Sequence, residues 1–185
     1  GFLPLHAAWV ADESALTERR YAIDHIQFGY SPNAKALQKA RERLINNFSN
    51  SLLIVNEPCA SNVQALPNSS RETQAVTSYF QNHQQLHHEQ ATRKAVLSAL
   101  PDHGILHFSC HGKVEWTEPL KSGLIMAANE RLTLKDFFAL QLQNPRLAVL
   151  SACETGLPGI KLPDEVVSLP TGLIQAGLSG VVSSL

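Results

Sequence analysis

Residues 147–156, Leu-Ala-Val-Leu-Ser-Ala-Cys-Glu-Thr-Gly, constrain the fold of this chain more than any other stretch. The first half is continuously apolar, which is typical of a strand buried on both faces of a parallel sheet. The second half contains small residues, Cys153 and a glycine. Because open α/β sheets bind their ligands at the carboxyl ends of the strands, Cys153 stands where a reactive group is expected. The stretch therefore predicts an α/β fold built on a parallel sheet.

A second apolar stretch, Leu-His-Phe-Ser-Cys-His-Gly at residues 106–112, ends in a similar way. We expect the two strands to lie side by side, so that His111 and Cys153 meet at their carboxyl ends. In a pair of this kind the imidazole activates the thiol, and the thiolate attacks a carbonyl carbon. The spacing alone establishes only that a Cys/His pair can form.

The histidine stretch also imitates a helical metal site, since His103, His107 and His111 are each four residues apart. Gly104 and the residues that follow it favour a strand instead. Side chains on a strand alternate between its two faces, so Cys110 is expected to point away from His111. We therefore predict that Cys110 is a small buried residue and that His107 is a core polar group in need of a hydrogen-bond partner.

Together, Cys-His-Gly at 110–112 and Leu-Ser-Ala-Cys-Glu-Thr-Gly at 150–156 resemble the motifs of the CHAT-domain family. The resemblance covers nearly the whole chain and includes residues 3–8, Ala91-Thr92, 164–167 and Ala176-Gly177. The family consists of caspase-like cysteine peptidases of clan CD that are often fused to TPR repeats. The resemblance implies a caspase-like three-layer α/β/α sandwich with a mostly parallel central sheet.

The resemblance also assigns roles to the residues at the two strand ends. It implies that Cys153 is the nucleophile and that His111 is its general base or ion-pair partner. The candidate donors to the developing oxyanion are the backbone amides of Gly112 and Cys153. Glycine suits this position because no Cβ keeps the backbone away from the substrate.

Three acidic residues near Cys153 in the sequence are the candidate substrate-binding groups: Glu154, Asp164 and Glu165. Relatives in the wider clan often use an acidic group to hold a basic residue before the cut, so these carboxylates predict a preference for basic residues. Two alternatives stay open. Asp164 and Glu165 can instead complement the dipole at the start of a helix, and Glu154 can form a structural hydrogen bond in the turn after Cys153.

Composition excludes several classes of function. The chain has 185 residues, a net charge of −1 and three widely spaced cysteines. Its balanced charge gives no electrostatic footprint for nucleic acid, and no apolar run approaches the ~20 residues of a membrane-spanning helix. The cysteines do not suggest a disulfide framework, and we expect no signal peptide and a reduced, cytoplasmic setting.

We expect neither a cofactor nor a metal. His83 and His87 are four residues apart, which is a metal-ligand spacing on a helix. Their stretch contains no cysteine, and its acidic neighbour is Glu89. The family that the chain resembles has no metal there. We interpret the stretch as an exposed helix end followed by a short edge strand.

Residues 1–185 are expected to form a single domain of a longer protein, truncated at both ends. The chain begins at Gly1 and stops within an apolar stretch at 180–185, so the C-terminal part of the fold is expected to be missing. The resemblance implies flanking domains such as TPR repeats. The length itself is sufficient for one domain with a sizeable core.

The expected function is that of a cysteine endopeptidase acting on a protein or peptide substrate through a His/Cys dyad. The resemblance implies activation by a regulatory partner or a fused domain, as in bacterial immunity and CRISPR-associated TPR–CHAT systems. The alternative is a catalytically silent interaction module with the same fold. The presence of both His111 and Cys153 favours the peptidase, because a silent site would be free to lose either residue.

The remaining pattern predicts the other elements of the fold. Residues 113–122 are expected to be a loop that walls a cleft, and residues 157–163 a loop beside the substrate groove. The strands are expected at 2–9, 23–30, 52–55, 105–109, 123–127, 147–150 and 180–185. The helices are expected at 34–48, 69–82, 89–100, 134–140 and 164–176.

Overall fold

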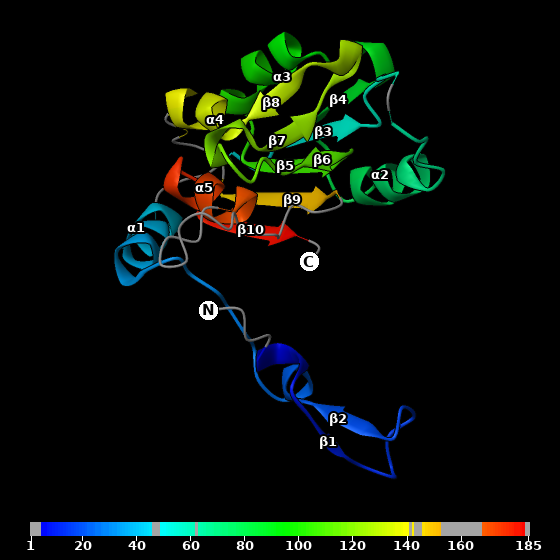
Figure 1. Ribbon diagram of the computed structural model, residues 1–185, viewed down its shortest axis with the longest axis vertical. Helices are drawn as coiled ribbons and strands as arrows, with labels where there is room; N and C mark the ends of the chain where they lie inside the picture. The colour runs from blue at the N-terminus through cyan, green and yellow to red at the C-terminus, as the bar shows by residue number, and fades with distance from the viewer. Residues whose placement is uncertain are drawn as a thin grey trace. The chain divides into compact units, whose positions relative to one another are not determined.

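The computed structural model describes residues 5–45, 49–61, 63–140, 142, 146–152 and 168–183. The chain divides into two compact units between Ser31 and Pro32. The first unit contains a two-stranded antiparallel sheet. The second contains a five-stranded sheet and a three-stranded sheet (Figure 1).

The first unit differs from the prediction. Short 3₁₀ turns lie at Leu5–Ala7 and Ala22–Asp24, and the strands are β1 (Trp9–Ala11) and β2 (Arg19–Tyr21), so the strands predicted at 2–9 and 23–30 are wrong. Trp9 and Val10 of β1 are half or more exposed, and the Arg19 guanidinium lies 4.3 Å from the centre of the Trp9 ring. The described apolar residues of this unit are therefore not buried, and a strand prediction that assumes their burial placed the strands at the wrong residues.

The five-stranded sheet of the second unit is parallel throughout, as predicted. Its strand order is β10-β9-β5-β3-β4, and each neighbouring pair is parallel. The strands are β3 (Leu52–Asn56), β4 (His83–His87), β5 (Ile105–Ser109), β9 (Leu147–Ser151) and β10 (Gly180–Ser183). From β3 the chain first adds β4 on one side and then β5, β9 and β10 on the other. The strand order thus reverses between β3 and β5, and sheets of this kind bind ligands outside the carboxyl ends at such a point.

Helices cover both faces of this sheet, which confirms the three-layer α/β/α arrangement (Figure 1). One face carries α2 (Ser69–Thr77), and the other carries α3 (Arg93–Ala99), α4 (Leu134–Leu140) and α5 (Leu169–Gln175). Helix α1 (Ala34–Leu44) contacts α5, where Nη1 of Arg43 donates to the carbonyl oxygen of Ile174 at 3.3 Å.

The two faces of the sheet differ in what they bury. The face under α3, α4 and α5 is apolar along its length, and its sheet residues are Leu53, Val55, Leu86, Leu106, Phe108, Ala148 and Leu150. On the α2 face a smaller cluster of Leu52, Ile54 and Ile105 packs with Val76 and Phe80. Toward the carboxyl ends of the strands this second face becomes polar, with buried Asn56, His107 and Ser109.

Helix boundaries follow local capping groups. Asn33 caps α1 and Thr92 caps α3, each by accepting from the backbone N–H three residues on. The helix predicted from residue 164 begins at Leu169 in the described part of the chain, because Ser168 is extended and its side chain caps the first turn. Gly177 ends α5 with φ +127°, where a Cβ would collide with the Leu142 carbonyl, as predicted for a glycine stop.

A three-stranded antiparallel sheet follows β5 directly. It consists of β6 (Gly112–Lys113), β7 (Gly123–Ile125) and β8 (Arg131–Thr133), in that order. The loop predicted at 113–122 therefore begins within a strand, and it contains a 3₁₀ turn at Pro119–Lys121. Further 3₁₀ turns occupy His88–Gln90, Leu100–Asp102 and Ala127–Asn129, so the helix predicted at 89–100 is shorter than expected.

Candidate active site

The two motif strands lie side by side with their carboxyl ends in register. Ser109 at the end of β5 pairs with Ser151 at the end of β9. The Cys110 amide donates to the Ser151 carbonyl oxygen at 3.4 Å, which extends the pairing beyond β5. His111 follows at once, and β9 leads through Ala152 into Cys153. Cys153 lies outside the described residues, as do the other predicted residues Glu154, Asp164 and Glu165.

The His111 side chain is held at the partly exposed end of β5. Its backbone carbonyl accepts from the Ile125 amide of β7 at 2.8 Å. Its Nε2 lies 2.7 Å from the carbonyl oxygen of Gln64. Because a carbonyl oxygen can only accept, Nε2 must carry a hydrogen, and Nδ1 is the nitrogen that takes up a proton when the ring is neutral. The geometry thus selects the tautomer with its hydrogen on Nε2.

The Gln64 carbonyl is a contact of His111 that the sequence did not reveal, since a backbone atom leaves no side-chain signal. Glu57 positions the loop that contains it. The Glu57 amide donates to the Ser109 carbonyl oxygen at 2.8 Å, and its carboxylate accepts from the Leu66 amide at 2.7 Å and the Ser69 hydroxyl at 3.1 Å. One residue therefore fixes both ends of the loop beside His111.

Gly112, the predicted oxyanion donor, is the first residue of β6 and pairs with Leu124 of β7. It follows His111 without an intervening loop. Its position beside the imidazole is compatible with the predicted role, which stays a prediction.

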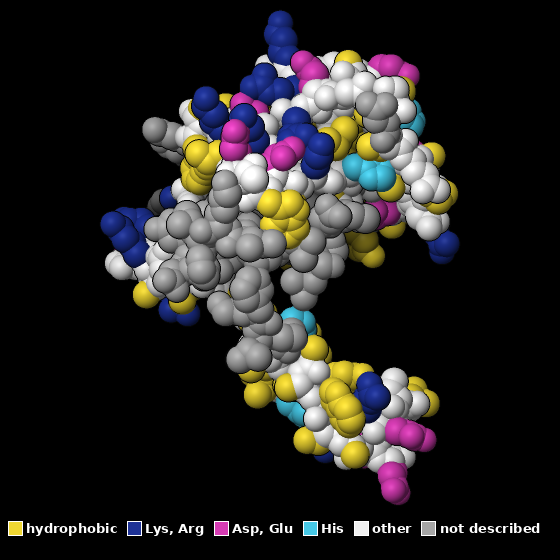
Figure 2. All heavy atoms as spheres, viewed as in Figure 1, with side chains coloured by type: hydrophobic (Ala, Val, Ile, Leu, Met, Phe, Trp, Pro, Cys, Tyr) yellow, Lys and Arg dark blue, Asp and Glu magenta, His cyan; other side chains and the backbone are white. Residues whose placement is uncertain are grey.

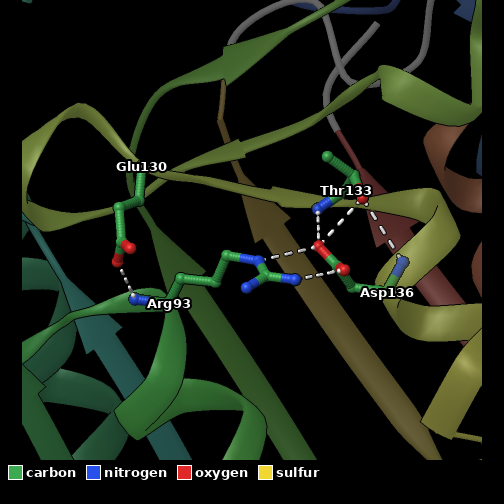
Figure 3. Close-up of polar contacts among 4 residues, drawn as sticks. All are labelled: Arg93, Glu130, Thr133 and Asp136. Atoms are coloured by element: carbon green, nitrogen blue, oxygen red, sulfur yellow. Dashed lines mark hydrogen bonds and ion pairs between the residues drawn. The ribbon is translucent and has the colours of Figure 1, made fainter.

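The small sheet that begins at Gly112 is anchored to the helix layer by the network in Figure 3. Nε of Arg93 donates to Oδ2 of Asp136 at 3.1 Å, and Nη2 donates to Oδ1 at 2.6 Å. Asp136 also accepts from the Thr133 amide and hydroxyl, and Glu130 accepts from the Arg93 amide at 3.1 Å. Burial opposes ionisation of Asp136, but the donors of Arg93 and Thr133 outweigh it and lower the pKa of this carboxyl.

Charged side chains of both signs are interspersed over β7 and β8 on the face that Figure 2 shows. Several of them are paired. Arg131 donates to Glu115 at 2.8 Å, and Lys121 forms an ion pair with Glu118. The hydrogen bond from Arg131 lowers the pKa of Glu115. This surface is therefore a mixed, ion-paired one and not a patch of a single sign.

Beneath the strand ends, Glu72 of α2 contacts both motif strands. Its Oε2 accepts from the Ser109 hydroxyl at 3.0 Å and from the Ser151 hydroxyl at 3.1 Å. Nε2 of the buried His107 lies 3.1 Å from Oε1, although the angle falls short of a hydrogen bond. Burial lowers the pKa of His107 and outweighs the opposing effect of Glu72, so the imidazole is neutral near pH 7.

Glu72 is the charged group nearest to His107, but the hydrogen-bond partner that His107 was predicted to need is not found among the described atoms, and the sequence did not identify Glu72. A signal was present, because Ser109 stands two residues before His111 and Ser151 stands two residues before Cys153. Two hydroxyls at equal offsets on adjacent parallel strands can share one acceptor. The acceptor, Glu72, lies on a helix far away in the sequence, and no feature of the residues around it indicates this contact.

The two cysteines in the described part of the chain are poor nucleophiles. Cys110 is buried among the core residues, as predicted, and burial raises the pKa of its thiol far above the ordinary value. Cys59 is exposed, but the Glu89 carboxylate raises the pKa of its thiol, with smaller contributions from burial and Glu57. Neither has the electropositive surroundings that generate a reactive thiolate.

A pocket of about 340 Å³ lies between α2 and the ends of β3 and β4, one strand away from β5. Asn56, Thr73, Gln85 and His87 are among its lining residues. The buried Oδ1 of Asn56 has no hydrogen-bond partner among the described atoms. None of the described residues that line the pocket carries a carboxylate.

Within the described ranges, no three His, Cys, Asp or Glu side chains are grouped to hold a metal ion. His83 and His87 lie on β4 and not on a helix. Nδ1 of His83 contacts the Phe80 carbonyl oxygen, and Nδ1 of His87 contacts the Asn56 amide nitrogen. The helices in the described part of the chain are too short or too polar to cross a membrane.

The architecture is that of a caspase-like α/β fold. The complex of Porphyromonas gingivalis RgpB pro- and mature domains is similar in structure, with a TM-score of 0.50 and 13% sequence identity. The similarity covers 81% of this chain and 37% of that chain, so this chain spans well under half of the solved one. At that identity the likeness concerns the fold alone.

The family model of the CHAT domain matches residues 1–185, and the chain therefore belongs to the CHAT-domain family. CHAT domains are relatives of the caspase-like cysteine peptidases. No curated protein sequence matches the chain.

Proposed function

We propose that this domain is a cysteine endopeptidase that uses His111 and Cys153 as its dyad. The observation that carries the proposal is the register of β5 with β9, which leads into His111 from one strand and into Cys153 from the next. The hydrogen bond from His111 to the Gln64 carbonyl supports the assignment, because it leaves Nδ1 to act as the base.

In the proposed reaction, Nδ1 of His111 takes the proton of the Cys153 thiol and forms a thiolate–imidazolium pair. The thiolate attacks the scissile carbonyl, and the amides of Gly112 and Cys153 stabilise the oxyanion. The imidazolium then protonates the leaving amine as the C–N bond breaks. Water, activated by the neutral imidazole, hydrolyses the thioester and restores the thiol.

The substrate is proposed to be a protein or peptide with a basic residue before the cut, held by Glu154, Asp164 and Glu165. The lack of a carboxylate among the described residues that line the pocket beside α2 supports this assignment. We further propose that a regulatory partner or fused domain switches the peptidase on, and that it works in a reducing, cytoplasmic compartment that preserves the thiol.

The test is cleavage of a diverse peptide library by the full-length protein, with and without candidate activators. His111→Ala and Cys153→Ala are each expected to lower kcat/KM by about 100-fold or more, because each removes a member of the dyad. His83→Ala and Cys59→Ala are the matched controls and should cleave like the unmodified protein. The residue preferred before the cut tests the basic-residue proposal in the same data.

The proposal is overturned if the full-length protein cleaves nothing under any condition and Cys153 is alkylated no faster than Cys59. That result would leave the catalytically silent interaction module as the function of the fold.

A further inference from the structure

We propose that Glu72 is a positioning residue that clamps the carboxyl ends of β5 and β9 together beneath the dyad. The inference rests on the proposed function and deepens it. Neither the family match nor the structural neighbour assigns a role to this side chain. Its carboxylate contacts both motif strands through their side chains at this end of the sheet.

The contacts have the form of a clamp. One oxygen of Glu72 accepts from Ser109 at 3.0 Å and from Ser151 at 3.1 Å, and these serines are paired across the two strands. Hydrogen bonds to a charged acceptor are stronger than those between neutral groups. The other oxygen faces the neutral imidazole of His107, so β5 contributes a second contact.

The clamp acts where the backbone ladder weakens. Regular pairing of β5 with β9 ends at Ser109 and Ser151, and the next bond, from the Cys110 amide to the Ser151 carbonyl oxygen, is long at 3.4 Å. The residues that follow are His111 on one strand and, two residues after Ser151, Cys153 on the other. A shift of about 1 Å in one strand end is enough to lower the rate of a positioned reaction by up to about 100-fold.

The clamp is tested by amide hydrogen exchange together with peptide cleavage, both on the full-length protein. Two variants break the same contacts from opposite sides: Glu72→Ala, and the double variant Ser109→Ala/Ser151→Ala. Each is expected to speed exchange of the Cys110 amide several-fold and to lower kcat about tenfold, with KM nearly unchanged. Combining all three substitutions should add little, because the groups act as one unit.

Two further variants separate positioning from general stability. Val76→Ala lies on the same helix, loses apolar packing on the α2 face and leaves the clamp intact. It should lower the unfolding midpoint without changing exchange at Cys110 or kcat. Glu72→Gln keeps one acceptor oxygen and is expected to restore part of the kcat lost in Glu72→Ala.

The outcomes distinguish this inference from the proposed function. If His111→Ala abolishes cleavage while the clamp variants match Val76→Ala in exchange and kcat, the clamp is wrong and the peptidase stands. If no form of the protein cleaves, the proposed function fails, and exchange at Cys110 still decides whether the strand ends depend on Glu72. Unchanged exchange would overturn the clamp in that case too.

Discussion

The two faces of the parallel sheet belong to the same strands, but one face buries apolar side chains and the other buries polar side chains near the strand ends. Phe108 and Ser109 are adjacent in β5, and both are almost completely buried. Phe108 enters the apolar cluster under α3, α4 and α5, with its ring centre 6.5 Å from that of Phe137. Ser109 turns to the opposite face and donates to Glu72 of α2.

This difference separates stability from positioning. Apolar burial is non-directional and scales with the area removed from water, so the apolar face holds the sheet together without fixing individual atoms. Hydrogen bonds to the partly exposed Glu72 carboxylate are directional and depend on tenths of an ångström. The polar face therefore holds the strand ends in place, and the apolar face makes the sheet stable enough to carry buried polar groups.

The largest expected difference comes from truncating the two neighbours. Phe108→Ala should reduce the free energy of unfolding by about 3–5 kcal/mol, because it opens a cavity in the core. Ser109→Ala should reduce it by about 1 kcal/mol, the net contribution of a typical hydrogen bond. Urea unfolding at constant m-value measures both, and Phe108→Leu replaces Phe108→Ala if the latter does not fold. Equal costs at the two positions would remove the distinction between the faces.

Much of the apolar face was predictable from the sequence. The continuous apolar runs at β3, β5 and β9 identified parallel strands, because strands buried on both faces need no polar alternation. The same reasoning failed in the described residues 5–30, where apolar side chains such as Val10 and Ile23 are exposed and none belongs to the buried core. Hydrophobic patterning predicts secondary structure only where the apolar side chains pack together into a buried core.

The polar face was only half predictable. Alternation placed His107 and Ser109 on one face and showed that His107 needed a partner. The Glu72 carboxylate lies 35 residues before His107, and the Gln64 carbonyl lies 47 residues before His111, on elements whose local sequence carries no sign of the contact. Such contacts arise from the crossing of α2 and its loop over the strand ends, which is a property of the tertiary fold.

The next expected effect concerns the helix layer over the apolar face. Asp136→Asn removes the charged acceptor of Arg93 and should reduce the free energy of unfolding by about 1–2 kcal/mol, a modest value because the Arg93 side chain is 40% exposed. Urea unfolding measures the loss. Glu118→Gln, which disrupts the exposed pair with Lys121, is the control and should change stability by less than about 0.5 kcal/mol. A cost for Asp136→Asn no larger than that of the control would contradict an anchoring role for the network.

His107 gives the polar face a dependence on pH that the apolar face lacks. The pKa of His107 is below the ordinary 6.5 in the folded protein. Between the lowered pKa and about pH 6.5, the imidazole is therefore more protonated in the unfolded chain than in the folded chain. The stability that the neutral imidazole contributes is present above about pH 6.5 and is lost as the pH falls through the lowered pKa. For one proton the slope is at most about 1.4 kcal/mol per pH unit.

Urea unfolding between pH 7.5 and 5.5 measures this slope, and His107→Gln should flatten it. Asp136, whose pKa is lowered from 3.8, titrates below this window and does not contribute. If His107→Gln shows the same slope, other groups cause the pH dependence, and burial of His107 does not make the free energy of unfolding depend on pH.

The smallest expected effect is a difference between the rates at which iodoacetamide alkylates the cysteines. Mass spectrometry measures these rates. Cys110 lies on the apolar face with a strongly raised pKa and should react only when the protein unfolds. Cys59 should react slowly in the native protein, and Glu89→Gln should speed its reaction a few-fold by removing the main cause of its raised pKa. Reaction of Cys110 at the rate of Cys59 would mean that the apolar face opens without unfolding. Since both thiols are slow for stated physical reasons, fast labelling of the native protein can be assigned to Cys153, and its rate then measures how far the polar face activates the proposed nucleophile.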